Sequence, residues 1–186
     1  MKKILFLIIF IFGCNNDNEI NLNKNNSPFW EVKFFVNQLK EPTNVGYITN
    51  MDPILGTFHR NNTSTSTLKV KIMIKEKAIA IKLYENGEKQ SVKISMQEPI
   101  EYKINIKHDN NDIDFNFRGI HENDVVIISD IISTTHQTTL INLFKLGGKF
   151  QFHLETNDKN KSVYDFELND PLNFHFSELY ENLNKS

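Results

Sequence analysis

Apolar and polar residues alternate along much of the chain after Trp30, and a period of two is typical of a β-strand with one buried face. The pattern is clearest from Leu68 to Ile74, where lysines stand between apolar residues. Similar alternation or short apolar runs predict strands at 30–36, 45–49, 55–59, 79–83, 92–96, 100–107, 113–118, 125–132, 150–154 and 163–168. For 30–36 a helix competes, because Ser27-Pro28 resembles a helix start and Phe35 interrupts the alternation, but the strand is favoured.

The segment 134–146 changes to helical periodicity. Leu140, Leu143 and Phe144 fall on one face, and Gly147-Gly148 follows them as a C-terminal cap. This spacing predicts a short helix that ends at the glycine pair.

A second helix is predicted at the C-terminal end of the sequence. Asp170 is the expected N-cap and Pro171 the expected first helical residue. The apolar residues that follow share one face at spacings of three and four, and they are Leu172, Phe176, Leu179 and Leu183. We expect this helix to pack over one end of the sheets.

Turn signals separate the strands, and the strongest is Asn86-Gly87, where both residues tolerate a positive φ. About ten short strands with turns every eight to twelve residues are typical of an antiparallel sandwich. The predicted fold class is therefore mainly β, an antiparallel β-sandwich with one or two short helices in the C-terminal half. A single such domain is predicted for residues 29–186.

The N-terminal segment differs in composition from the rest. Lys2 and Lys3 precede an apolar run from Ile4 to Phe12, which is shorter than the roughly 20 residues of a membrane-spanning helix. Gly13 and the only cysteine, Cys14, then complete the layout of a bacterial lipoprotein signal peptide. We expect cleavage between Gly13 and Cys14 and lipidation of the Cys14 thiol, including palmitate. A plain secretory signal with an incidental cysteine is the alternative.

The segment that follows the cysteine predicts a tether. Residues 14–28 are rich in asparagine and poor in apolar residues, so we expect a flexible linker between the lipid and the domain. The predicted organisation is thus a signal peptide at 1–13, a lipidated tether at 14–28 and a domain at 29–186. The expected location is a bacterial membrane, the outer membrane in particular, facing the periplasm or the cell surface.

The net charge and the cysteine content argue against several classes of function. The formal net charge of −2 argues against a general nucleic-acid binder. Lipidation would use the single cysteine, so neither a disulfide nor a thiol catalyst is expected in the mature chain.

No motif predicts catalysis, a metal or a cofactor. A GxSxG motif and a phosphate-binding glycine loop are absent, and the histidines show no metal-ligand spacing. The acidic run 109–114 lacks the glycine and distal glutamate of a calcium loop. We expect no enzyme activity, although a hydrolase pair assembled from distant strands is an alternative.

The candidates for a binding surface are few. Phe35 breaks the alternation of its strand and is the best candidate for an exposed aromatic side chain. Lys69, Lys71 and Lys103 lie on the predicted outer faces of strands, where lysine also discourages edge-to-edge pairing.

The order of several short motifs resembles that of small exported bacterial lipoproteins of β-sandwich type, and more distantly that of accessory proteins of type VI secretion. The motifs are Trp30-x-Val32, Gly56-x-Phe58, Leu68-x-Val70-x-Ile72, Ile79-x-Ile81-x-Leu83-Tyr84-Glu85, Leu143-x-x-x-Gly147-Gly148-x-Phe150-x-Phe152 and Tyr164-x-Phe166-x-Leu168. The resemblance implies a fold and carries no catalytic residue across.

Together these observations predict a lipid-anchored envelope protein that binds a protein partner, as an inhibitor, an immunity protein or a secretion accessory. The alternative is a structural or adhesive surface lipoprotein. The expected partners are the membrane, through Cys14, and a protein of the envelope.

Overall fold

The computed structural model describes residues 29–61, 64–86, 100–109, 111–122, 125–129, 134–159, 161–170 and 173–185. The predicted signal peptide, the predicted lipidation site Cys14, the predicted tether and the predicted strand at 92–96 lie outside these ranges. Within them, no helix combines the length and the apolar character that crossing a membrane requires.

The described part of the chain forms ten strands and two helices. In chain order they are β1 (Trp30–Val36), β2 (Pro42–Asn50), β3 (Ile54–Arg60), β4 (Ser66–Lys75), β5 (Ala78–Glu85), β6 (Glu101–His108), β7 (Asn111–Glu122), β8 (Val125–Ser129), α1 (Thr134–Leu146), β9 (Gly148–Thr156), β10 (Ser162–Asp170) and α2 (Asn173–Asn184). The described residues therefore confirm a mainly β chain with two short helices in its C-terminal half.

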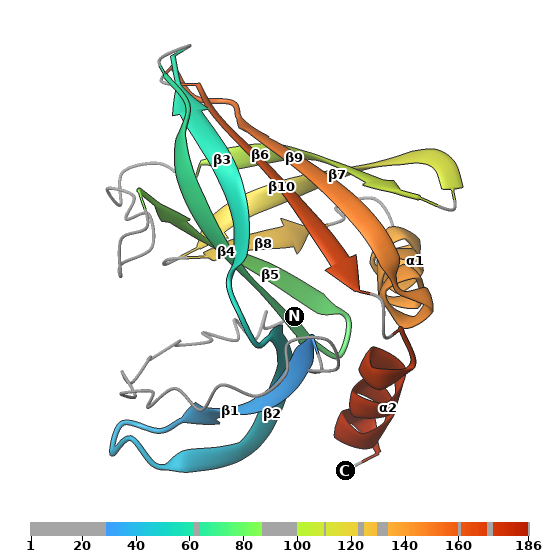
Figure 1. The fold of residues 1–186 in the computed structure, drawn as a ribbon. Coiled ribbons are helices and arrows are strands. Elements are labelled where there is room, and N and C mark those ends of the chain that lie inside the picture. Colours follow the sequence, from blue (N-terminus) through green and yellow to red (C-terminus); the bar gives the residue numbers. More distant parts are fainter. Residues whose placement is uncertain are drawn as a thin grey trace, which may run out of the picture.

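Eight of these strands close into an antiparallel barrel (Figure 1). The order around the ring is β4-β3-β10-β9-β6-β7-β8-β5, and β5 returns to β4 along its whole length. The prediction of a β-sandwich is therefore wrong. The strands of a sandwich and of a barrel show the same alternation, so the sequence pattern does not distinguish the two folds. The pairings that close the ring, β3 with β10 and β5 with β8, join segments that are far apart along the chain.

Side chains fill the interior of the barrel. The ring strands contribute to the core cluster Phe58, Leu68, Val70, Ile72, Ile81, Leu83, Tyr102, Ile104, Ile106, Phe117, Val126, Ile128, Phe150, Phe152, Leu154, Tyr164, Phe166 and Leu168. Phe152 and Phe166 stack inside it with ring centroids 4.6 Å apart. A barrel of eight strands has an interior just wide enough for such packing.

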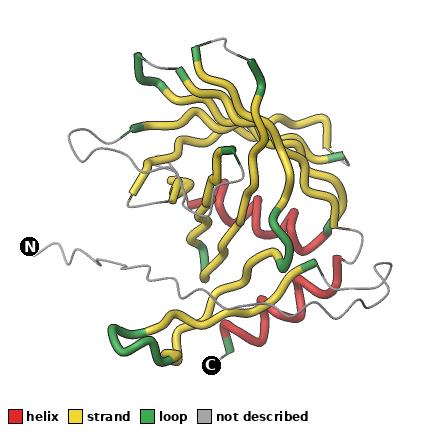
Figure 2. Tube along the Cα trace, turned by 60° about the vertical axis from the view of Figure 1, so that its left-hand side comes forward, coloured by secondary structure: helices red, strands yellow, loops and turns green. Residues whose placement is uncertain are grey.

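Strands β1 and β2 form a hairpin outside the ring, which we call the arm (residues 30–50). Its β2 pairs with β4 only at Ile48 and Thr49, beside the end of β4. Both views show the arm extending away from the barrel, with α2 next to it (Figures 1 and 2). The strand prediction for 30–36 is confirmed, and a bulge between Phe34 and Val36 accounts for the interrupted alternation at Phe35.

Helix α1 has the bounds that its periodicity predicts. It buries Leu140 and Phe144 against the barrel, and Gly147 ends it with φ of 68°. The amide of Gly147 donates to the carbonyl oxygen of Leu143 at 3.1 Å, which is the expected capping geometry.

Helix α2 begins later than predicted. Asp170 is the last residue of β10 instead of an N-cap, and its carboxylate accepts a hydrogen bond of 2.7 Å from Trp30 Nε1. Asp170 is 1% exposed, and a buried carboxylate requires a hydrogen-bond donor of this kind. Trp30 thereby ties the base of the arm to the barrel. The predicted apolar face is confirmed at Phe176, which is fully buried.

Candidate functional site

An apolar groove lies between the arm and α2, outside the barrel. It encloses about 650 Å³, within the range of ~300–1,000 Å³ common for ligand pockets. Its apolar lining comes from Val32 and Phe34 of β1, Val45 of β2, and Leu179 and Leu183 of α2. The groove could therefore take up apolar groups that would otherwise be in water.

The arm side of the groove presents apolar side chains to solvent. Phe34 is 51% exposed and Val45 is 37% exposed. Phe34 follows Trp30 and Val32 on one face of β1, and only the first of these three is fully buried. The alternation that predicts a buried face thus continues into the groove, where nothing in the described part of the chain completes the burial of Phe34.

The α2 side is held in place by contacts to the rest of the fold. Phe176 is buried against Trp30 with ring centroids 5.1 Å apart. One turn later, Tyr180 Oη donates to the carbonyl oxygen of Glu76 at 2.8 Å. Lys145 Nζ lies 4.7 Å from the centroid of the Tyr180 ring. Leu179 and Leu183 are therefore carried by a helix anchored to the core and to the β4–β5 turn.

Gly46 allows the two sides to approach closely. A Cβ at this position would lie 2.5 Å from Leu183 Cδ1 and 3.3 Å from Phe34 Cε1. Any side chain at Gly46 would therefore occupy the floor of the groove. The polar residues at its margin are Asn44, Lys75, Glu76, Asn182 and Asn184.

Phe35, the predicted exposed aromatic residue, is only half-buried and lies on the opposite face of the arm. Its ring packs on Tyr47 at 4.7 Å, over the outer surface of the barrel, next to Met73 and Ala80. The more exposed aromatic side chain is that of its neighbour, Phe34. The sequence signal at Phe34 was regular alternation, which predicts burial and gives no indication of a groove.

The three predicted surface lysines do not form one patch with each other. Lys69 is exposed on β4, while Lys71 on the same strand donates to the carbonyl oxygens of Asn50 and Met51. Lys71 therefore holds the bend between β2 and β3. Lys103 is exposed on β6, which is separated from β4 by three strands of the ring.

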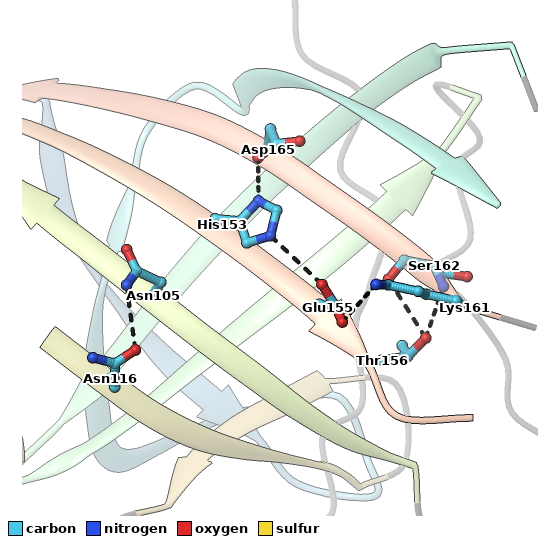
Figure 3. Close-up of polar contacts among 8 residues, drawn as sticks. All are labelled: Asn105, Asn116, His153, Glu155, Thr156, Lys161, Ser162 and Asp165. Atoms are coloured by element: carbon cyan, nitrogen blue, oxygen red, sulfur yellow. Dashed lines mark hydrogen bonds and ion pairs between the residues drawn. The ribbon is translucent and has the colours of Figure 1, made fainter. Parts of the chain in front are cut away.

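A second concavity of about 470 Å³ lies on the outer face of β3, β6, β9 and β10, and both the exposed Leu55 and several polar side chains line it. Cross-strand pairing aligns Thr57, Asp165, His153, Asn105 and Asn116 in one row across five strands. In Figure 3, His153 points toward Asp165, and Asn105 points toward Asn116. His153 Nδ1 lies 2.7 Å from Asp165 Oδ1, and Asn105 Nδ2 donates to Asn116 Oδ1 at 3.3 Å. This row has no local signature in the sequence, because its members lie far apart along the chain.

Ion pairs flank this row. Lys161 lies 2.8 Å from Glu155 and lowers the pKa of that carboxyl group, and Lys149 does the same for Glu167. His153 and Asp165 are each about half exposed, so their pair is open to water. The described residues contain no group of three side chains that could hold a metal ion.

A third candidate site is a polar cluster at the end of the barrel where β3 ends and β10 begins. Glu85 accepts a hydrogen bond of 2.8 Å from Tyr164 Oη and forms an ion pair of 2.6 Å with Arg60. Tyr102 Oη lies 3.2 Å from His121 Nδ1 in the same region. Burial raises the pKa of the Tyr102 and Tyr164 phenols above the ordinary value, so both stay neutral at physiological pH. These contacts satisfy polar groups at the end of a packed core.

No family model matches the chain, and no curated protein or solved structure shows significant similarity to it. The resemblance to exported lipoproteins and to secretion accessory proteins therefore stays a prediction. Of the three sites, the arm groove is the one in which two exposed apolar side chains, Phe34 and Val45, face further apolar side chains on an anchored helix. The second concavity also exposes Leu55.

Proposed function

We propose that this protein is a lipid-anchored binding module of the bacterial envelope and that the arm groove receives an apolar segment of a protein partner. The observation that carries the proposal is the half-exposed Phe34 beside Val45 in a groove with an anchored opposite side. Apolar residues at the centre and polar residues at the margin are the usual arrangement of a protein interface.

The packed barrel supports a role for the outer surface. Its interior is occupied by aromatic and aliphatic side chains, so the barrel acts as a rigid frame. A frame of this kind holds the arm and α2 at a constant distance from each other. Because little rearrangement is then needed, the entropic cost of binding is reduced.

The geometry of the polar row favours binding over hydrolysis. A general base works best in a site that restricts water and positions a substrate. His153 and Asp165 instead lie on the open face of a sheet, with 48% and 49% of their side chains exposed. The groove is therefore a better candidate for the functional site than this row.

The test is affinity capture from detergent-solubilised membranes with three tagged full-length chains: wild type, Phe34→Asp and Leu55→Asp. Leu55 is the matched control because it is 73% exposed on β3, away from the groove. A central aromatic contact often contributes 2 kcal/mol or more, so we expect recovery of the partner to fall more than about tenfold for Phe34→Asp.

The Leu55→Asp chain should recover the partner as wild type does. Equal recovery with both variants would contradict the groove as the binding site. If wild type captures no partner in stoichiometric amount, the structural surface lipoprotein becomes the better explanation.

A further inference from the structure

Strand β1 lies at the edge of the sheet. Within the part of the chain that the structure describes, it comes first in the strand order and has β2 as its single neighbour. Among those residues, one long side of β1 is therefore not paired with a strand. An edge of this kind presents main-chain N–H and C=O groups that can pair with another extended chain.

The register of the arm shows which main-chain groups point to this edge. The amide of Met51 donates to the carbonyl oxygen of Phe29 at 2.9 Å, and the pairing of β1 with β2 continues the same register. In an antiparallel ladder, hydrogen-bonded pairs alternate with pairs that are not hydrogen-bonded. Every second residue after Phe29 therefore bonds to β2. Val32 and Phe34 fall between those positions, so their N–H and C=O groups point toward the open edge.

The same two residues line the arm groove with their side chains. Val32 is partly buried against the core, and Phe34 is 51% exposed. Glu31 and Lys33 alternate with them on the opposite face of the strand and form an ion pair of 2.9 Å with each other. A chain that lies along this edge would thus meet main-chain hydrogen-bonding groups and an apolar face at the same positions.

We propose that the partner segment received by the groove is an extended strand, which pairs with the edge of β1 and directs every second, apolar side chain toward Val32 and Phe34. This inference rests on the proposed function of the groove and specifies the conformation of its occupant. A helix satisfies its own main-chain groups, so a docked helix would cover the edge groups of β1 without pairing them. An added strand pairs them, and its alternate side chains supply specificity.

A bulge limits the length of the added strand. The register of β1 is regular from Trp30 to Phe34 and shifts between Phe34 and Val36. A bulge bends its strand and disrupts pairing at that point. We therefore expect the paired segment to be short and to match the regular part of β1.

The test selects peptides on the purified full chain from a display library of random heptapeptides. Binding of the enriched peptides is then measured by fluorescence polarisation on wild type, Val32→Pro and Val32→Ala. Proline is tolerated on an edge strand where the N–H would face solvent, so Val32→Pro should keep the fold. It removes one donor from the edge and places a ring in the path of a pairing strand. Val32→Ala keeps the donor and is the matched control.

We expect the enriched peptides to carry apolar residues at every second position. Their affinity should fall more than about tenfold for Val32→Pro, because a main-chain hydrogen bond is lost and the strand cannot approach. For Val32→Ala it should fall less than about threefold, because only part of one apolar contact is removed. Urea unfolding of Val32→Pro should have a midpoint close to that of wild type.

Hydrogen exchange followed by NMR tests the same edge without a variant. In the free wild-type chain, the amides of Val32 and Phe34 should exchange faster than the amide of Lys33, which bonds to β2. The bound peptide should slow exchange at Val32 and Phe34 by more than about tenfold, because both amides then lie inside a ladder.

Three results would overturn the inference. Peptides that bind Val32→Pro as well as wild type, or that show no alternation, are held by side chains alone. If no peptide is enriched, the edge does not accept a strand. If the amides of Val32 and Phe34 exchange slowly in the free chain, this chain or a second copy already covers the edge, and light scattering distinguishes the two. The capture experiment with Phe34→Asp is independent of these results, so failure of the groove and failure of strand pairing are distinguishable.

Discussion

The barrel and the arm are built from similar alternating strands, but they use their apolar faces differently. In the ring, every second side chain faces a closed interior, and residues such as Ile104 and Leu154 are fully buried. In the arm, the same alternation leads from the buried Trp30 to the half-exposed Phe34. The pattern of a strand therefore states which side chains share a face, and the neighbouring elements decide whether that face is covered.

This difference between barrel and arm predicts which substitutions affect stability and which affect binding. Substitutions inside the barrel should lower the free energy of unfolding, whereas substitutions on the exposed part of the arm should leave it nearly unchanged and affect binding. The junction at Trp30 belongs to both regions, because it packs on Phe144 and Phe176 while starting the first strand of the arm.

Trp30→Ala is expected to have the largest effect on stability. It removes a side chain that is 1% exposed and leaves the buried carboxylate of Asp170 without the indole donor. Truncation of a buried tryptophan costs about 3–5 kcal/mol. Urea unfolding followed by circular dichroism measures the change, since the chain has only one tryptophan for fluorescence. A loss below about 1 kcal/mol would show that the arm is not held to the barrel by this residue.

Two glycine substitutions compare the regions directly. A Cβ at Gly56 in the ring would lie 2.4 Å from the backbone oxygen of Asp165, so Gly56→Ala should lower stability by about 1–3 kcal/mol. A Cβ at Gly46 in the arm meets the end of the Leu183 side chain, which can move. Gly46→Ala should therefore cost less in the same unfolding measurement and should weaken capture of the partner. Equal losses of stability would contradict the distinction between barrel and arm.

Tyr164→Phe tests the polar end of the barrel. It removes the hydrogen bond to the partly buried Glu85, and we expect a loss of about 1–3 kcal/mol at neutral pH. Burial raises the pKa of Tyr164 above its ordinary value of 10.0, so the neutral phenol contributes its full stability below about pH 10 and loses it as the pH rises further. Alkaline unfolding of the variant should accordingly depend less steeply on pH than that of wild type. An unchanged slope would mean that Tyr164 is not the group that titrates.

Lys161→Met is expected to have the smallest effect. The Lys161 ammonium group lowers the pKa of the Glu155 carboxyl group, and loss of the lysine should raise that pKa toward 4.5. A lowered pKa contributes stability above the pKa of the unfolded chain and loses it as the pH falls, so the variant should be slightly less stable near neutral pH. Exposed pairs contribute about 0–1 kcal/mol, and salt screens them. Carboxyl titration by NMR would detect the shift, and an unchanged pKa would contradict the ion pair.

Local patterns predicted the elements well. The strand at 30–36, the helix at 134–146 and its glycine cap follow from residues that are neighbours in sequence, and the structure confirms them. Asp170 shows where this reasoning fails. Its position before a proline resembles an N-cap, but a tryptophan 140 positions away supplies its partner instead.

The candidate site could not be predicted in the same way. Val45, Phe34 and Leu183 belong to three elements, and each carries an ordinary apolar signal in its own segment. Phe35 stood out because it interrupts the alternation, yet the interruption reflects a bulge and a contact with Tyr47. No local feature distinguishes an apolar residue that faces a groove from one that faces a core.

A mainly β chain, the faces of most strands and the position of α1 follow from the amino-acid sequence, because they depend on the alternation and capping of adjacent residues. The sequence also predicts the lipid anchor, from a motif confined to the N-terminal segment. The choice between sandwich and barrel depends on long-range pairing, since the ring closes through the pairing of β3 with β10 and of β5 with β8. The position of the arm outside the ring, and the exposure of Phe34 and Leu39, also depend on the tertiary structure. A side chain is buried only if an element from elsewhere in the chain packs against its face.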